Sequence, residues 1–263
     1  MVDPPRYGPT ALVVGAAQGL GRAFSRELHR AGFDLVLVDR EAEALRRLAR
    51  ETGAQAVLTD LGDPAALESM LADLPVERVG LLVYNAAQAT RGPFEEMSAA
   101  LLDRHLQVNC RGPLLCARAV LPGMVARGRG GVVLLSSMVA FFGAPGLGPY
   151  AASRGFTLAL GESLAAELAD TGVDVLVGCP GATDTDGFRA SHPDPEEVAK
   201  MRLASPEATA REILGAVGRR AVHVCGRRNR LGFHLLQRLL PRRLATSTIA
   251  SHLERLYGPL SRR

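Results

Sequence analysis

The chain of 263 residues alternates short, almost continuously apolar runs with stretches of helical periodicity. The runs, rich in Val and Leu, cover residues 11–15, 34–39, 54–60, 79–85, 132–137, 173–179 and 221–225. Strands without an alternating polar face are buried on both sides, as in a parallel sheet covered by helices. The alternation therefore predicts an α/β fold: one doubly wound domain around a parallel sheet of about seven strands.

The segments between these runs carry the start and stop signals of helices. We expect helices over residues 20–31, 41–52, 64–73, 99–127, 150–170 and 205–218. Asp63 before Pro64 predicts an N-cap followed by proline in the first turn, and Gly53 predicts a C-cap. The helix over 99–127 is expected to be irregular near Gly112-Pro113 and Pro122.

Composition narrows the class of protein. The apolar fraction of 47% and the charged fraction of 22% are typical of a soluble globular protein, and a net charge of only +4 indicates no nucleic-acid partner. Four cysteines without a C-x-x-C pair predict reduced thiols and no metal site. The first ten residues contain neither an apolar signal core nor an arginine-rich presequence, so we expect a cytoplasmic protein. The uncharged stretch 131–153 contains four glycines and two prolines, which argue against a membrane helix.

A glycine-rich turn, GAAQGLG over residues 15–21, joins the first apolar run to the first helix. Glycines let the backbone approach a pyrophosphate, and the helix N-terminus offers free N–H groups to that anion. Tight packing without a ligand is the alternative. The position at the first strand–helix junction favours a dinucleotide site.

Asp39 ends the second run, 18 residues after Gly21. A carboxylate there would accept hydrogen bonds from the 2′-hydroxyl of an adenosine ribose and repel a 2′-phosphate. We therefore expect NAD(H) to be favoured, with NADP(H) possible because Arg40 stands beside the acid. The alternative is an acid that caps the next helix.

The fifth run ends at Ser136-Ser137, and Pro149 opens the helix that carries Tyr150 and Arg154. Positions i and i+4 share one helical face, so the phenol and the guanidinium point the same way. A hydroxyl, a phenol and a fixed positive charge can together handle a proton beside a carbonyl or alcohol group. The alternative is a core strand followed by a helix with a polar rim.

Taken together, these motifs resemble the short-chain dehydrogenase/reductase family over nearly the whole chain. Asp60-Leu61 resembles the pair that holds the adenine, and Asn85-Ala86-Ala87 resembles the Asn-Ala-Gly signature, with alanine in place of the glycine. Asn109 matches the asparagine that kinks the long helix and holds a relay water. Ser137 precedes Tyr150 by 13 residues, which is the family's spacing, and therefore takes the catalytic role rather than Ser136.

The resemblance implies a Rossmann-type domain over residues 1–226, a set of catalytic residues and a set of cofactor-binding residues. The catalytic set is Asn109, Ser137, Tyr150 and Arg154. The cofactor-binding set is Gly15, Gln18, Gly19, Leu20, Gly21, Asp39, Arg40, Asp60, Leu61, Asn85, Ala86, Ala87, Tyr150, Arg154, Pro180, Gly181, Thr183 and Thr185. The family also commonly forms dimers or tetramers through two long helices, which here are the helices over 99–127 and 150–170.

Arg154 departs from the family, which has lysine at this position. The lysine binds the nicotinamide ribose, promotes ionisation of the tyrosine and passes a proton onward. A guanidinium keeps the charge and the donors but is a poor proton shuttle, and its planar fork fits differently. Either Arg154 reflects drift in a chain whose only lysine is Lys200, with activity retained, or it marks a cofactor-binding relative with weak, altered or no hydride transfer.

The activity implied by the resemblance is NAD(P)-dependent oxidoreduction, with hydride transfer between the cofactor and a secondary alcohol or ketone. Phe188 and Phe141-Phe142 favour an apolar small-molecule substrate, with core packing as the alternative. Residues 182–202 are expected to form a polar lid, with His192 exposed in it. The alternative functions are a non-redox dehydratase or cyclase that uses Tyr150 as acid and base, or a catalytically weak cofactor-binding protein.

Residues 227–263 form a basic, amphipathic tail that we expect to be helical. Leu231, Leu235, Leu236, Leu239 and Leu240 predict one apolar face flanked by arginines. This face could contact an anionic membrane surface or a partner subunit, or fold back over the substrate pocket.

Overall fold

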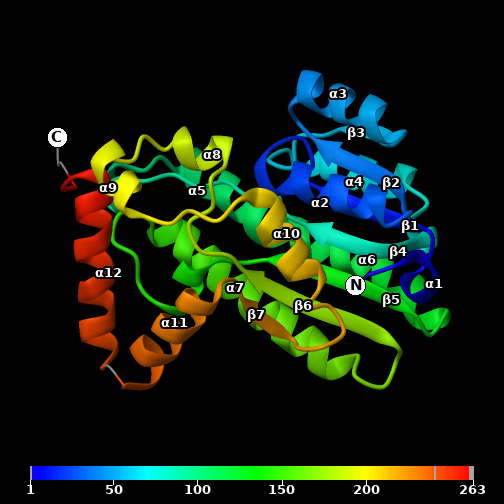
Figure 1. Ribbon diagram of the computed structural model, residues 1–263. Helices are drawn as coiled ribbons and strands as arrows, with labels where there is room; N and C mark the ends of the chain where they lie inside the picture. Colours follow the sequence, from blue (N-terminus) through cyan, green and yellow to red (C-terminus); the bar gives the residue numbers. More distant parts are fainter. Residues whose placement is uncertain (1, 240, 261–263) are drawn as a thin grey trace.

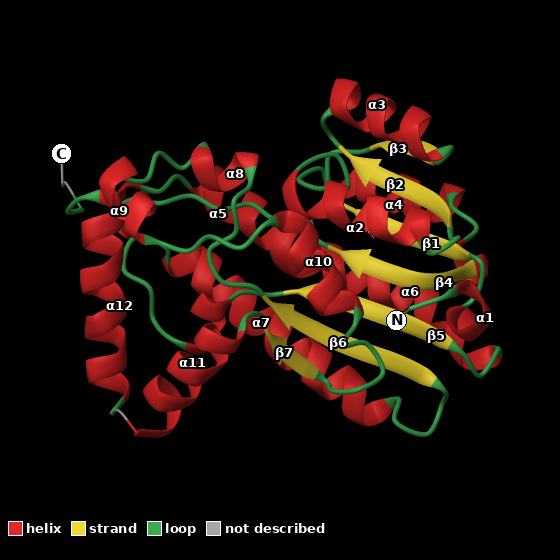
Figure 2. Ribbon diagram, viewed as in Figure 1, coloured by secondary structure: helices red, strands yellow, loops and turns green. Residues whose placement is uncertain are grey.

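The computed structural model describes residues 2–239 and 241–260, except for the side chains of residues 234–239. Its centre is a parallel sheet in the order β3-β2-β1-β4-β5-β6-β7 (Figures 1 and 2). The strands are β1 (Thr10–Val14), β2 (Asp34–Asp39), β3 (Gln55–Leu58), β4 (Val79–Tyr84), β5 (Gly130–Leu135), β6 (Val173–Cys179) and β7 (Val222–Val224). This architecture confirms the predicted fold class. The strand order changes direction between β1 and β4, and such a switch point places a crevice at the carboxyl ends of these strands.

Helices cover both faces of the sheet. On one face, α2 (Gly19–Arg30), α3 (Ala42–Thr52) and α10 (Pro206–Leu214) pack on one apolar cluster. On the other face, α4 (Pro64–Asp73), α6 (Gly112–Ala126) and α7 (Gly148–Glu167) pack on a second cluster. Successive residues of β1 enter different clusters, since Val13 belongs to the first and Leu12 to the second. Burial on both faces explains why the strands read as continuous apolar runs.

The helix predicted over residues 99–127 is divided by one wide turn. It consists of α5 (Ala99–Leu106), a π-helical segment over Gln107–Arg111, and α6. The hydroxyl of the buried Tyr84 donates a 2.6 Å hydrogen bond to the carbonyl oxygen of Val108 within this segment. A Cβ atom on Gly112 would overlap that hydroxyl. The tyrosine at the end of β4 therefore accounts for the irregularity predicted near Gly112-Pro113.

Several predicted boundaries differ from the structure at the ends of elements. The fifth strand begins at Gly130 and ends at Leu135, so Ser136 and Ser137 lie beyond it. Three short helices were not predicted, because each covers too few residues to show apolar periodicity. They are α1 (Pro4–Tyr7), α8 (Asp186–Arg189) and α9 (Pro195–Lys200). The described part of the structure also contains three single-turn 3₁₀ segments, η1 (Val76–Arg78), η2 (Phe94–Glu96) and η4 (Met138–Phe141).

The root of the tail is fixed by a polar cluster around Glu212 of α10. The carboxylate accepts hydrogen bonds from the backbone N–H of Gly226 at 3.0 Å and from Arg230 at 2.7 Å, and it contacts His223 at 3.0 Å. Burial alone would raise the pKa of Glu212, but these donors hold it below its usual value. The cluster joins α10, β7 and α11 (Arg227–Leu239), and thereby sets the direction in which the tail leaves the sheet.

The tail then folds back on the domain through α12 (Arg242–Tyr257), which lies beside α9 (Figure 1). Leu253 of α12 packs with Ala144 and Ala151, and the N–H of Asp194 donates to the carbonyl of Leu256 at 2.7 Å. These contacts favour the fold-back interpretation of the tail. Leu231 is 65% exposed, whereas the side chains of Leu235, Leu236, Leu239 and Leu240 lie outside the described part of the structure.

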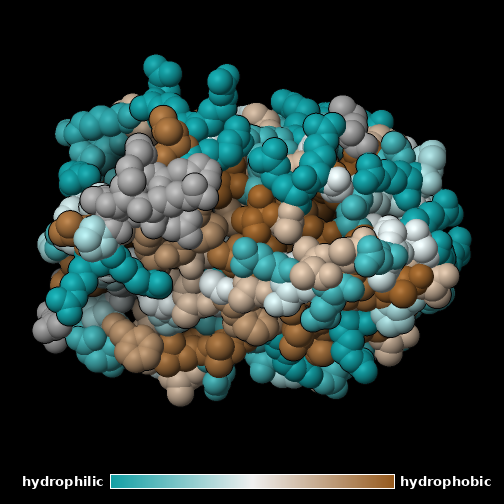
Figure 3. Space-filling model, turned by 90° about the horizontal axis from the view of Figure 1, so that it is seen from below, coloured by the Kyte–Doolittle hydropathy of each residue, from teal (hydrophilic) through white to brown (hydrophobic). Residues whose placement is uncertain are grey.

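Hydrophobic residues are exposed at several places on the surface of the protein. Figure 3 shows hydrophobic residues near the centre and along the lower part of the face seen from below, and hydrophilic residues mainly along its upper and right-hand edges. On the outer sides of α6 and α7, Leu114 and Phe156 are 42% and 38% exposed. Assembly into a dimer or tetramer through these helices stays a prediction. Among the described residues, none of the helices has the length and apolar character needed to cross a membrane.

Candidate functional site

A cavity of about 1600 Å³ follows the carboxyl ends of the strands from the glycine-rich turn to the tail. Most of the predicted site residues line it: Gly15, Gln18, Gly19, Leu20, Asp39, Arg40, Asp60, Leu61, Asn85, Ala86, Ala87, Ser137, Tyr150, Arg154, Pro180, Gly181, Thr183 and Thr185. Gly21 and Asn109 do not line it. The structure therefore brings together residues that are up to 170 positions apart in sequence, as the crevice at a topological switch point requires.

The glycine-rich turn is packed too closely for side chains. Gly15 has a φ of +78°, and a Cβ on it would lie 2.6 Å from the backbone of Ala86. A Cβ on Gly21 would overlap the carbonyl oxygen of Gly15, and the amide of Asn85 donates to that same oxygen at 2.8 Å. The turn is thus fixed against the end of β4, as close approach to a pyrophosphate demands.

The first turn of α2 leaves its backbone donors available. Gln18 is the N-cap residue, and its side chain makes no capping hydrogen bond. The N–H groups at an uncapped N-terminus combine with the helix dipole to favour an anion. Thr185 packs against Gly19 from the opposite side, so the segment after β6 covers this turn. These residues fit the pyrophosphate of a dinucleotide.

Asp39 lies at the end of β2 beside the same turn. One carboxylate oxygen accepts from the N–H of Ala17 at 2.8 Å, and the other accepts from the N–H of Glu41 at 3.0 Å. Each oxygen keeps a lone pair for a further donor, such as a ribose hydroxyl. Arg40 is exposed and forms an ion pair with Glu41 at 3.4 Å.

Asp60 is held by a residue that the sequence did not indicate. Arg104 of α5 donates to both carboxylate oxygens of Asp60, at 2.7 and 2.9 Å, and the N–H of Gly62 donates at 2.9 Å. Burial opposes ionisation, but these donors keep the pKa of Asp60 below its usual value. Asp60 is therefore ionised at neutral pH at the predicted adenine end of the cavity.

The two serines after β5 differ in what their hydroxyls do. Ser136 is buried and donates to the carbonyl oxygen of Arg154 at 2.8 Å. Ser137 is half-buried and accepts a long 3.4 Å bond from the N–H of Val139, which leaves its own proton without an acceptor in the described structure. Ser137 is thus the serine that can donate to a ligand.

Tyr150 and Arg154 stack on each other at the start of α7. The guanidinium carbon lies 4.9 Å from the centroid of the phenol ring. Arg154 is only 3% exposed, and its Nη1 donates to the carbonyl oxygen of Leu135 at 2.7 Å. Its Nε is buried without a hydrogen-bond partner in the described residues. The hydroxyl of Tyr150 likewise makes no hydrogen bond with the described residues, so it keeps its donor for a ligand.

Asn109 lies behind the cavity wall and is fully buried. Its side chain accepts from the N–H of Gln88 and donates to the Gln88 carbonyl, both at 2.8 Å. It also donates to the hydroxyl of Ser153 at 3.0 Å, and that hydroxyl donates to the carbonyl of Tyr150 at 2.8 Å. Asn109 therefore connects the loop after β4 to α7, and its contacts are those of a residue that positions Tyr150.

The opposite end of the cavity has apolar walls. Phe142 and Phe188 line it as predicted, but Phe141 does not, because its ring packs on Phe233 at a centroid distance of 4.3 Å. The prediction for Phe141 was therefore wrong. His192 is exposed, as expected for a loop residue. Five wall residues come from α12 and were not predicted individually: Ile249, His252, Leu253, Leu256 and Tyr257.

Arg91 fixes the end of α12 against the loop after β4. Its guanidinium donates to the carbonyl oxygen of Gly258 at 2.6 Å and lies 5.4 Å from the centroid of the Tyr257 ring. The hydroxyls of Tyr257 and Ser191 are 3.1 Å apart. The wall formed by α12 is thus held from two sides.

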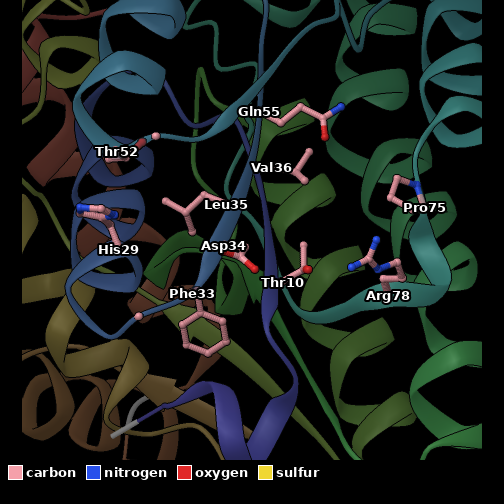
Figure 4. Close-up of a pocket in the computed structure, with 12 residues that line it drawn as sticks. Thr10, His29, Phe33, Asp34, Leu35, Val36, Thr52, Gln55, Pro75 and Arg78 are labelled. Atoms are coloured by element: carbon pink, nitrogen blue, oxygen red, sulfur yellow. The ribbon is translucent and has the colours of Figure 1, made fainter.

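A second cavity of about 520 Å³ lies at the opposite edge of the sheet (Figure 4). Thr10 and Asp34, which begin β1 and β2, line it together with His29, Thr52 and Arg78. None of the predicted site residues takes part. No cluster of three or more metal-ligating side chains occurs among the described residues of the chain.

Comparison with known proteins agrees with this geometry. The family model for short chain dehydrogenases matches residues 9–196. Oxidoreductase UcpA of Escherichia coli is 36% identical over 213 residues, which cover 76% of this chain and 81% of that protein. The 7beta-hydroxysteroid dehydrogenase of Collinsella aerofaciens is 30% identical over 237 residues, with 87% and 90% covered.

Solved structures share the fold, and one of them covers nearly the whole chain. A structure from work on 7beta-hydroxysteroid dehydrogenase stereoselectivity superposes with a TM-score of 0.88 at 28% identity. The match covers 95% of this chain and 99% of that protein's chain. A bulky-bulky ketone specific alcohol dehydrogenase from Comamonas testosteroni has a TM-score of 0.70 at 27% identity, with 86% and 91% covered. A short-chain dehydrogenase from Sphingobium yanoikuyae in complex with NADPH has a TM-score of 0.75 at 29% identity, with 87% and 92% covered.

The packing of the glycine-rich turn generates a prediction. Gly21→Ala is expected to lower the free energy of unfolding by about 1–3 kcal/mol, because the new methyl group displaces the Gly15 carbonyl. It should also weaken dinucleotide binding at least about tenfold through loss of the turn. Thermal unfolding and titration calorimetry measure both effects. Gly148→Ala, where a Cβ meets nothing within 4 Å, is the matched control. An unchanged dinucleotide affinity in Gly21→Ala would contradict the assignment of the turn.

Proposed function

We propose that this chain, which belongs to the short-chain dehydrogenase family, acts on a bulky, apolar ketone and the matching secondary alcohol. The family assignment makes it an NAD(P)-dependent oxidoreductase of alcohol and ketone groups. One observation carries the proposal. Ser137, Tyr150 and Arg154 line the same cavity as the glycine-rich turn, and the cavity continues beyond them between apolar walls.

The proposed mechanism assigns a proton to Tyr150. The nicotinamide cofactor supplies or accepts the hydride when it is bound. In the direction of reduction, the substrate oxygen accepts hydrogen bonds from the hydroxyls of Ser137 and Tyr150, whose protons have no acceptor in the described structure. Tyr150 then gives its proton to that oxygen, while Ser137 stabilises the developing negative charge.

Arg154 holds the charge that this proton transfer requires. Its guanidinium stacks on the ring of Tyr150, so a fixed positive charge faces the tyrosinate that forms. The bond from Nη1 to the carbonyl of Leu135 fixes that position. A guanidinium does not release its proton at physiological pH, so the proton returned to Tyr150 comes from water or from a hydroxyl group in the cavity.

Two features support a bulky substrate. A ligand pocket commonly measures about 300–1000 Å³, and this cavity of about 1600 Å³ leaves room beside a dinucleotide. The structural relatives include proteins titled as a hydroxysteroid dehydrogenase and as a bulky-bulky ketone specific alcohol dehydrogenase. Both names describe large, apolar secondary alcohols or ketones, which suit walls made by Phe142, Phe188 and Leu253.

We propose NAD(H) as the preferred cofactor. Asp39 presents two carboxylate oxygens beside the glycine-rich turn, and a 2′-phosphate there would meet like charge. Arg40 offsets this charge only in part, because it is already paired with Glu41. The Sphingobium relative was solved with NADPH, so the family likeness does not decide between the two cofactors. The proposal of NAD(H) is therefore based on Asp39 of this chain.

The role of Tyr150 is tested by removal of its hydroxyl. Tyr150→Phe is expected to lower kcat at least about 10³-fold, because the general acid is lost, while the dissociation constant for NAD changes less than about threefold. Nicotinamide absorbance with a panel of bulky ketones and alcohols measures the rate, and calorimetry measures cofactor binding. A Phe variant with the rate of the unmodified enzyme would refute the mechanism.

Substitution at Arg154 separates an active enzyme from a cofactor-binding protein without chemistry. Arg154→Met is expected to lower kcat/KM by about 10²-fold or more, since the charge beside Tyr150 is lost, whereas Arg154→Lys keeps activity within about tenfold. The same absorbance assay measures both variants. If the unmodified protein binds NAD tightly but converts none of the panel, the interpretation of Arg154 as the mark of a cofactor-binding relative without hydride transfer is favoured. Product formation without cofactor turnover would instead indicate non-redox acid–base chemistry.

Cofactor preference provides a further test. The unmodified enzyme should show a kcat/KM for NAD at least about tenfold higher than for NADP, and Asp39→Asn should reduce this ratio by about tenfold, because it removes the repelling charge but keeps an acceptor oxygen. Arg40→Ala is the matched control and should move the ratio the other way. An Asn variant with an unchanged ratio would show that Asp39 does not read the ribose.

A further inference from the structure

The two ends of the large cavity differ in charge. Its three acidic lining residues, Asp39, Glu41 and Asp60, all lie at the end where we place the adenosine. At the substrate end, the cavity is lined by six basic residues and by no carboxylate among the described residues. These are Arg91, Lys200, Arg202, Arg227, Arg228 and His252.

The basic residues converge from separate segments of the chain. Arg202 follows α9, Arg227 and Arg228 form the first turn of α11, and His252 lies on α12. In Figure 1, α9, α11 and α12 all stand on the same side of α7, away from β3 and α3. The fold-back of the tail therefore assembles this group of charges at one end of the cavity.

Three of these six side chains, Arg202, Arg227 and Arg228, are not neutralised by a carboxylate among the described residues. Lys200 is paired with Glu197 at 2.5 Å, and Arg91 donates to the carbonyls at the end of α12. In contrast, Arg202, Arg227 and Arg228 are exposed and form no ion pair with any described residue. We refer to these three residues as the arginine rim.

The walls beneath the arginine rim are apolar. Phe142, Phe188 and Phe233 line the cavity together with Leu253 and Leu256, and the last two are buried in the protein. A neutral hydrocarbon would fill these walls but leave three exposed positive charges of the cavity lining without a counter-charge from the described residues. A ligand with an anion at one end would satisfy both surfaces.

We propose that the substrate is amphipathic: a bulky apolar ketone or alcohol whose end remote from the reacting carbon carries an anionic group, held by the arginine rim. The inference rests on the proposed function and adds the charge of the substrate to it. The guanidinium groups are exposed, so each contributes modestly, and the three together are expected to favour the anion by about tenfold in affinity.

A pair of probes with the same apolar body tests the proposal. The probes are a keto derivative of cholanic acid and its primary amide, used below their aggregation concentration. Binding is measured with the NAD-loaded protein, and turnover is measured with NADH as the hydride donor. Calorimetry gives the dissociation constants, and nicotinamide absorbance gives kcat/KM. At about 20 mM salt the acid is expected to bind about tenfold more tightly than the amide, and about 0.5 M salt should reduce this ratio to about twofold.

Variants of the arginine rim identify the residues responsible. The triple variant R202A/R227A/R228A should bring the ratio of acid to amide affinity close to 1. Arg46 and Arg47 are two adjacent, exposed arginines on α3 outside the cavity, and R46A/R47A should leave the ratio unchanged. Because the readout is a ratio between two ligands on one protein, a general loss of stability does not imitate the result.

The outcomes separate this inference from the proposed function. If the amide is bound and converted as well as the acid, the proposed function stands and the arginine rim has no role in recognition. The inference also fails if the preference for the acid persists in the triple variant. If neither probe is bound, the bulky apolar substrate is wrong and the arginine rim falls with it.

Discussion

Two reciprocal hydrogen bonds between the segment at the end of β5 and α7 fix the geometry on which the site depends. The side chain of Arg154 donates to the carbonyl of Leu135, and the side chain of Ser136 donates to the carbonyl of Arg154. Both bonds are buried, so each replaces contacts with water that the strand end and the helix would otherwise need. They hold the last residue of the strand against the second turn of the helix. Ser137 and Tyr150, which flank these two bonds in the sequence, both line the same cavity.

A second brace supports the same helix from α5. The wide helical turn that forms around Tyr84 brings Asn109 to Ser153, and Ser153 in turn binds the carbonyl of Tyr150. The loop after β4 is tied to the same asparagine through both backbone groups of Gln88. The dinucleotide end and the phenol are thus connected through one buried side chain. Its own position outside the cavity suits support of the site better than contact with a ligand.

The sequence predicted the features that depend on local spacing, and missed those that depend on distant pairing. The glycine-rich turn and Asp39 are defined by their position at the end of one strand, and Ser137 and Tyr150 by the family's spacing of 13 residues, so both patterns can be recognised without coordinates. The bond between Arg104 and Asp60 joins residues 44 positions apart, and Arg91 reaches a carbonyl 167 positions away. Nothing in either local sequence marks its partner. The cavity wall formed by α12 depends in the same way on the fold-back of the tail. So does the packing of Phe141 on Phe233, which keeps Phe141 out of the cavity lining.

The contacts of Arg154 indicate which of the tasks that the family resemblance assigns to a lysine a guanidinium can perform at this position. One nitrogen is bound to the carbonyl of Leu135, and the guanidinium carbon lies 4.9 Å from the centroid of the phenol ring, so the charge stays beside the tyrosine. These are tasks of position and electrostatics, for which a rigid, planar cation is well suited. Transfer of a proton is different, because the guanidinium holds its own. We therefore infer that the protein separates the two tasks: residue 154 supplies the charge, and water or ligand hydroxyls in the cavity must carry the proton. The Nε of Arg154 is buried and has no hydrogen-bond partner within the described part of the chain, which is consistent with a group retained for its charge and shape.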